Sequence, residues 1–216
     1  VLSAYRDHNE PNIHASKLTL FIEEILLEAQ ITINQLNAVS VSKGPGSYTG
    51  LRIGVSVAKG ICYALDIPLI AVNTLDALVQ GFQASFVKES NPLNELKTLF
   101  CPMIDARRME VYAAIYNAKL EMIEPTAARI IEPDSFDYLT NQHQLIMFGD
   151  GADKLSDLFS ERASIQIHKG FQNSARYLIP ETIKRFKQQQ FEDVAYFEPF
   201  YLKDFIPTSP KRLIKS

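Results

Sequence analysis

The stretch Ser42-Lys43-Gly44-Pro45-Gly46-Ser47-Tyr48-Thr49-Gly50-Leu51-Arg52-Ile53-Gly54 decides how this chain folds. A short apolar segment, residues 38–41, precedes it, and a segment rich in apolar and small residues, 51–65, follows it. This order predicts a strand, a glycine-rich turn and a helix. A second apolar segment at 69–72 completes a strand–helix–strand unit, which implies two parallel strands joined by a right-handed crossover.

The turn itself allows two interpretations. Gly44 and Gly46 permit backbone angles that other residues disfavour, and Ser47 or Thr49 can cap the following helix through a side-chain oxygen. A turn of this kind presents N–H groups that can hold an anion, so Gly44, Gly46 and Ser47 are candidate anion-binding residues. It is not a P-loop, because no Lys-Ser/Thr pair follows the last glycine. From the spacing alone, a tight turn with a well-formed cap is the better interpretation.

Small residues recur at every fourth position of the predicted helix. Gly50, Gly54, Ala58 and Cys62 therefore share one face of it. A stripe of small side chains lets another helix approach closely. Packing against the protein's own core is the more common use of such a stripe, and a contact with a second subunit is the alternative.

The motif at residues 43–54 resembles the signature of the TsaB (YeaZ) family, which supplies the partner subunit of bacterial tRNA threonylcarbamoyladenosine synthesis. Other segments match the family in order, so that the resemblance covers nearly the whole chain: 70–75, 104–107, 110–112, 149–151 and 198–202. It implies an α/β fold of the two-lobed actin-like ATPase (ribonuclease H-like) type, with mixed sheets flanked by helices. The family begins with two strands around an Asp-Thr-Ser turn, and this chain, which starts at Val1, is expected to lack them.

The composition of the chain limits the classes of protein to which it can belong. The chain has 216 residues, of which 46% are apolar, enough for a real core in one large domain or two small lobes. Its net charge of −3 is not typical of a protein that binds nucleic acid by itself. The apolar runs are too short to span a membrane, and no signal-peptide pattern is present. Cys62 and Cys101 do not suggest a disulfide framework, so we expect a reducing cytoplasm.

Apolar periodicity predicts the remaining elements. Residues 14–30 form an amphipathic pattern in which Leu18, Phe21, Ile22 and Ile25 share the apolar face. The polar segment 85–96 is expected to connect two lobes, residues 1–97 and 98–216. In the second lobe we expect strands at 99–104, 110–116, 129–131 and 145–148, and helices at 132–140 and 174–187.

Two aspartates each follow a predicted strand, where open α/β sheets place their ligands. The resemblance assigns these places to a phosphate turn and an adenosine turn. The candidates for a nucleotide cleft there are Asp105, Arg107, Gly149, Asp150 and Gly151. We favour the competing interpretation, in which such aspartates shape turns through hydrogen bonds to the backbone. No metal-site spacing is present among the four histidines, and no catalytic residue is predicted.

The resemblance implies a non-catalytic partner subunit. It would dock on the TsaD-type transferase, with a TsaE-type ATPase as a further partner, and would contact tRNA only through the complex. Alone it would form a homodimer through the same surface. The residues expected at this interface are Leu18, Phe21, Ile22, Ile25, Gly50, Gly54, Ala58 and Cys62. Weak ATP or ADP binding at the lobe junction is left open. The alternatives are a metallopeptidase of the glycoprotease type, against which the absence of paired histidines argues, and a self-contained ATPase or kinase.

Overall fold

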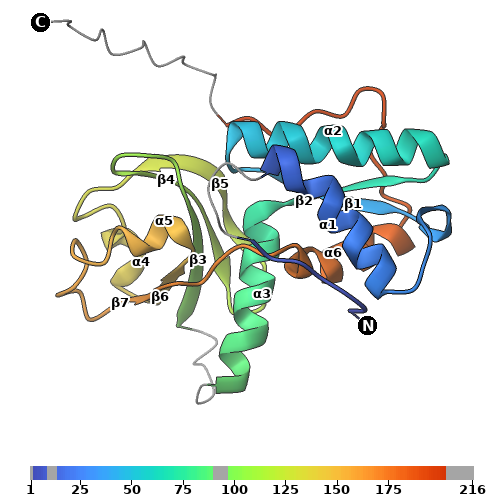
Figure 1. Ribbon diagram of the computed structural model, residues 1–216. Helices are drawn as coiled ribbons and strands as arrows, with labels where there is room; N and C mark the ends of the chain where they lie inside the picture. Colours follow the sequence, from blue (N-terminus) through green and yellow to red (C-terminus); the bar gives the residue numbers. More distant parts are fainter. Residues whose placement is uncertain (1, 9–13, 90–96, 203–216) are drawn as a thin grey trace, which may run out of the picture.

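Two separate β-sheets organise the chain (Figure 1). The computed structural model describes residues 2–8, 14–89 and 97–202. The first sheet pairs β1 (Val39–Gly44) with β2 (Leu69–Asn73), and the second orders its strands β5-β4-β3-β6-β7. The other strands are β3 (Thr98–Asp105), β4 (Glu110–Asn117), β5 (Met122–Ile130), β6 (Gln144–Phe148) and β7 (Ile165–His168). The helices are α1 (His14–Glu28), α2 (Tyr48–Leu65), α3 (Thr74–Glu89), α4 (Asp137–Thr140), α5 (Asp150–Asp153) and α6 (Ile179–Lys187), with 3₁₀ turns at Ile33–Gln35 and Ala175–Leu178.

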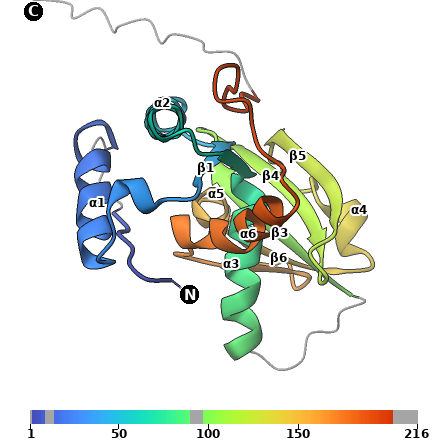
Figure 2. The same cartoon turned by 90° about the vertical axis from the view of Figure 1, so that its right-hand side faces the viewer.

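The first sheet confirms the predicted strand–helix–strand unit. β1 and β2 are parallel, with Val39 opposite Leu69 and Val41 opposite Ala71. All of β2 is buried, as its unbroken apolar sequence requires, because α2 covers one face of the strand pair and α6 packs against β2. α1 lies beside α2, at the outside of this lobe (Figure 2).

The second sheet is mixed, as the resemblance implies. β3, β4 and β5 form an antiparallel meander, whereas β6 and β7 run parallel to β3. Successive side chains of β3 point to opposite faces. Cys101 and Met103 enter the core beneath α4 and α5, and Phe100 enters the core beneath α3. α3 therefore serves as the connection between the two sheets and as a cover for the second one.

The C-terminal segment returns to the first sheet after β7. α6 packs on β2, and the N–H of Glu192 donates a hydrogen bond of 2.9 Å to the carbonyl of Leu69. The division of the chain into lobes 1–97 and 98–216 stays a prediction. The structure adds that residues after about 179 contact the first sheet.

Most predicted elements lie where they were expected, but four differ. The strand expected at 129–131 is the end of the longer strand β5. Its exposed residues and Pro125 break the alternation of apolar and polar side chains by which a strand is recognised in a sequence. The helix expected at 132–140 is only the single turn α4, and the one expected at 174–187 divides into a 3₁₀ turn and α6. β7 was not predicted. The connection expected at 85–96 begins inside α3, and its residues 90–96 lie outside the described part of the chain. No helix in the described part of the chain is long and apolar enough to cross a membrane.

Candidate functional site

The glycine-rich turn is tightly built. Ser47 caps α2, because its side chain accepts a hydrogen bond of 3.4 Å from the N–H of Gly50, as predicted. Gly44 adopts a φ of 109°, and a Cβ there would lie 2.9 Å from the carbonyl oxygen of Phe200. Gly46 has no positive φ, and a Cβ on it would meet only the side chain of Leu51, at 3.8 Å. The turn therefore needs a glycine at its first position and tolerates a side chain at the second.

The C-terminal segment docks on this turn and on α2. The N–H of Phe200 donates to the carbonyl of Lys43 over 2.7 Å. Tyr201 packs on Tyr48, with 4.9 Å between the ring centroids, and its hydroxyl accepts a hydrogen bond of 3.3 Å from Arg52. The guanidinium of Arg52 in turn lies 4.4 Å from the centre of the Tyr48 ring. Two motifs far apart in the sequence thus form one surface at the start of α2.

The stripe of small residues on α2 faces the chain's own core. Ala58 and Cys62 are 4% and 1% exposed and pack with Leu69 of β2, and a Cβ on Gly54 would lie 3.8 Å from Val41 of β1. The expectation that these three residues face a partner is therefore wrong for the folded chain. Spacing correctly placed them on one face but could not say that the sheet covers it. Gly50, in the first turn, is half-buried.

The apolar face of α1 is only half-covered. Leu18, Phe21, Ile22 and Ile25 are each half-buried, and α1 packs on α2. Further along α1, Leu27 is 81% exposed. The interface predicted for α1 stays a prediction, and apolar area is available there for a partner.

The loops after β3 and β6 meet and bring together Asp105 and Asp150, two of the candidates for a nucleotide cleft. The N–H of Asp105 donates to Oδ1 of Asp150 over 3.1 Å, and the N–H of Arg107 donates to Oδ1 of Asp105 over 2.9 Å. Lys154 forms an ion pair with Asp105 and donates to the carbonyls of Arg108 and Glu110, both over 2.7 Å. Both carboxylates thus hold the backbone in place, which is the interpretation that we favoured from the sequence.

The two glycines beside Asp150 allow this close approach. Gly149 has a φ of 98°, and a Cβ on it would lie 2.2 Å from the carbonyl oxygen of Met103. A Cβ on Gly151 would lie 2.7 Å from the backbone of Ile104. Burial raises the pKa of Asp150, although hydrogen bonds from the backbone oppose this shift.

The residues of this cluster do not by themselves fit a nucleotide. A phosphate placed here would meet the carboxylates of Asp105 and Asp150, which repel it because all three groups are negative. The nearby lysine, Lys154, is already paired with Asp105. The glycine-rich turn belongs to the other sheet, and no hydrogen bond among the described residues joins Gly44, Gly46 or Ser47 to Asp105 or Asp150. We therefore derive no catalytic step through ATP or ADP.

A polar cluster at the junction of the sheets was missed by the sequence analysis. The hydroxyl of Tyr116 donates to Oδ1 of Asp76 over 2.5 Å, and Nδ2 of Asn73 donates to Thr126 over 3.1 Å. Burial raises the pKa of both Asp76 and Tyr116. Asp76 lies in the first turn of α3 and its partner Tyr116 lies on β4, so no local pattern in the sequence relates the two. Among the described residues, no group of His, Cys, Asp or Glu could hold a metal ion.

Comparison with known proteins identifies the family of the chain. A family model described as TsaD: tRNA N6-adenosine threonylcarbamoyltransferase matches residues 11–204. The chain belongs to this family. Within this family, the chain is 30% identical to the tRNA threonylcarbamoyladenosine biosynthesis protein TsaB of Bacillus subtilis over 151 residues. These aligned residues cover 68% of the chain and 60% of that relative. It is 27% identical to TsaB of Escherichia coli over 90% of the chain and 82% of the relative. These relatives place it in the TsaB (YeaZ) branch.

A solved structure agrees on the fold. It is described as an uncharacterized protein from Pseudomonas aeruginosa with similarity to peptidase YeaZ, and it superposes with a TM-score of 0.72 at 22% identity, over 91% of this chain and 88% of that one. The likeness supports the two-lobed actin-like fold implied by the TsaB-type motifs.

Proposed function

We propose that this chain is the non-catalytic partner subunit for threonylcarbamoyladenosine formation at position 37 of ANN-decoding tRNAs. It docks on a TsaD-type transferase in the cytoplasm, and a TsaE-type ATPase joins the complex. The tRNA is contacted through the assembly, which agrees with the net charge of −3. The names of the TsaB relatives support the pathway, and the absence of a nucleophile–base arrangement among the candidates supports the accessory role.

The observation that carries the docking role is the incompletely covered face of α1. Leu18, Phe21, Ile22 and Ile25 retain exposed area although they form the helix's apolar stripe. Leu20 and Leu27 lie on the opposite, solvent-facing side of the same helix and are 51% and 81% exposed, so α1 offers apolar area on that side as well. Burying such area against a partner yields roughly 25 cal/mol per Å² before the costs of association. The revised interface is therefore α1 with the neighbouring outer side of α2, without Gly54, Ala58 and Cys62, which face the first sheet.

The experiment is a capture assay with the TsaD-type subunit of the same cell. Leu20→Arg should weaken binding at least tenfold, because a charged side chain in a desolvated apolar contact costs well over 1.4 kcal/mol. Ile123→Arg is the matched control, since Ile123 on β5 is also 51% exposed and lies on the second sheet. Both variants should melt like the parent. Equal binding by the parent and Leu20→Arg would remove the solvent-facing side of α1, which carries Leu20 and Leu27, from the interface.

The same surface should serve self-association. Light scattering should show a homodimer when the chain is alone, and a heterodimer should replace it when the TsaD-type subunit is added. The two assemblies compete because they use one surface. A ternary species that contains two copies of this chain on one TsaD-type subunit would contradict the shared surface.

A further inference from the structure

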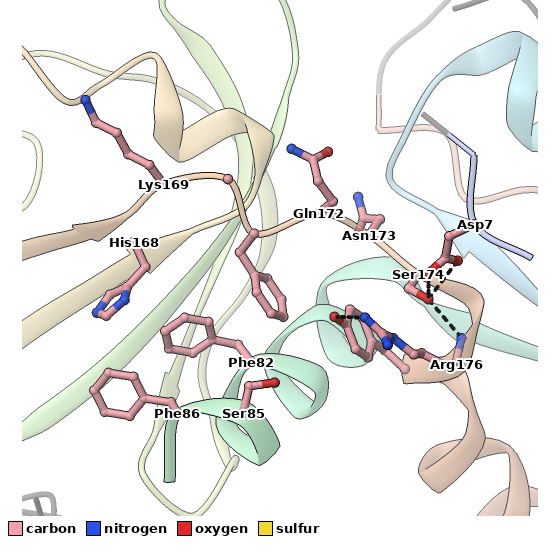
Figure 3. Close-up of a pocket in the computed structure, with 13 residues that line it drawn as sticks. Asp7, Phe82, Ser85, Phe86, His168, Lys169, Gln172, Asn173, Ser174 and Arg176 are labelled. Atoms are coloured by element: carbon pink, nitrogen blue, oxygen red, sulfur yellow. Dashed lines mark hydrogen bonds between the residues drawn. The ribbon is translucent and has the colours of Figure 1, made fainter. Parts of the chain in front are cut away.

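A cavity of about 540 Å³ lies between α3 and the segment that follows β7 (Figure 3). Its floor comes from α3, and its rim is formed by residues 168–177 and by Asp7 near the start of the chain. The size is within the range of about 300–1,000 Å³ that is typical of small-molecule sites. None of the functions described above uses it.

Aromatic rings form one wall of the cavity. Phe86 stacks on Phe82 with 5.2 Å between centroids, and Phe171 stacks on Tyr177 at 5.4 Å with an interplanar angle of 11°. Phe171 also meets Phe82 edge-on at 5.2 Å. Gly81 is required for this arrangement, because a Cβ there would lie 2.3 Å from the Tyr177 ring. Phe86, Phe171 and Tyr177 are only half-buried, so parts of their rings are left for a flat ligand.

The charge of the lining is opposite to that of the whole protein. Lys169 and Arg176 contribute two positive charges and Asp7 one negative charge, whereas the chain carries −3. Among the described residues, neither cation forms an ion pair. Arg176 instead lies 5.1 Å and 5.6 Å from the ring centres of Tyr177 and Tyr5, and Asp7 accepts hydrogen bonds from Ser174. The cavity therefore favours an anion next to an aromatic group.

Two side-chain amides complete the lining. Gln172 and Asn173 are exposed at the rim, on the segment that separates the aromatic wall from Arg176 (Figure 3). An amide offers both a donor and an acceptor, which is what the edge of a heteroaromatic base requires. Aromatic rings, amides and a guanidinium are the groups with which proteins hold single nucleotides.

We propose that this cavity binds a nucleotide. The base lies against Phe86 and Phe171, Gln172 and Asn173 pair with its edge, and Arg176 binds the phosphate while Lys169 adds attraction. A free mononucleotide and an unpaired nucleotide of an RNA present the same chemistry to these residues. The proposal is independent of the docking role of α1.

The test is calorimetric titration of the full chain with AMP. Saturable binding is expected, with weaker binding of adenosine and of inorganic phosphate, since each carries only half of the recognised groups. Arg176→Gln should weaken AMP binding about tenfold, because the hydrogen bond from a charged donor to the phosphate is lost. Phe171→Leu should weaken AMP and adenosine alike. Lys187→Gln, which removes an equally long cation from α6 outside the cavity, should change nothing.

Lys169→Gln provides a second charge-removing variant on an exposed side chain, so the proposal stays testable if Phe171→Leu melts early. It should weaken AMP binding without changing the melting temperature.

A short single-stranded RNA distinguishes a free nucleotide from a nucleotide of an RNA. RNA binding that is tighter than AMP binding and is lost in Arg176→Gln assigns the site to RNA, and binding of AMP alone assigns it to free nucleotide. No binding by either probe, or binding that Arg176→Gln and Lys169→Gln leave unchanged, overturns the proposal. Capture by the TsaD-type subunit should be the same in all four variants.

Discussion

The carbonyl oxygen of Phe200 lies 2.9 Å from the place that a Cβ on Gly44 would occupy. The same two segments are joined by the hydrogen bond from the N–H of Phe200 to Lys43. Because the C-terminal segment and the signature turn approach each other this closely, the first glycine of the turn is determined by packing as well as by its φ of 109°. The signature and the 198–202 motif are therefore two halves of one structural unit.

Gly44→Ala should destabilise the fold by about 1–3 kcal/mol, because it places a side chain in a left-handed conformation and against a carbonyl oxygen. Urea unfolding measures this difference. Gly46→Ala is the control, and it should change stability by less than about 1 kcal/mol, since its Cβ would find ordinary contacts with Leu51. Equal losses in both variants would mean that the turn does not have this geometry.

Ala58→Arg should prevent folding. Ala58 is 4% exposed and packs with Leu69, so the guanidinium would be buried without a partner, at a cost of several kcal/mol. Ser56→Arg is the matched control, because Ser56 is exposed on the same helix. Circular dichroism should show an unfolded Ala58→Arg and a native Ser56→Arg. A folded Ala58→Arg that no longer binds its partner would restore the interface interpretation of the stripe.

The sequence predicted what depends on local chemistry and missed what depends on distant contacts. The apolar run of β3 and the cap at Ser47 could be recognised because neighbouring residues determine them. Which glycine of the turn takes the positive φ could not, since the deciding atom belongs to Phe200. The use of the α2 stripe depended on the packing of β1 and β2. The cavity brings together α3 and residues 168–177, and no local pattern relates these segments.

The pH dependence of stability should reveal the pair formed by Asp76 and Tyr116. Burial raises the pKa of Asp76 above its ordinary value of 3.8. The hydrogen bond from Tyr116 is the largest effect that opposes this shift, Glu181 adds to the shift, and Arg185 and Lys43 oppose it. The folded state then holds this proton more tightly than the unfolded state does, so the contribution of Asp76 to stability falls as pH rises through the interval above 3.8.

Asp76→Asn removes this titration and keeps an oxygen that can accept from the Tyr116 hydroxyl. The unfolding free energy of the parent minus that of Asp76→Asn should therefore increase as the pH is lowered from 7 towards 4. Urea titrations across this range measure it, with Asp157→Asn, an exposed site, as the control. A difference that stays constant, or that has the opposite slope, would show that Asp76 titrates with an ordinary or lowered pKa.

Two helical glycines should respond to alanine in opposite ways. A Cβ on Gly81 of α3 would lie 2.3 Å from the ring of Tyr177, which is half-buried between α3 and Phe171. Gly81→Ala must displace this ring and should destabilise the protein by about 1–3 kcal/mol, the usual cost of overpacking.

Gly60 of α2 is exposed, and a Cβ on it would meet nothing within 4 Å. Gly60→Ala should stabilise by about 0.5–1 kcal/mol, because alanine favours the helix and glycine loses more entropy on folding. Thermal unfolding of the two single variants and the double variant measures both effects, and they should add, since a Cβ on Gly60 touches nothing and so shares no contact with one on Gly81. A gain of stability in Gly81→Ala would mean that Tyr177 does not rest on α3.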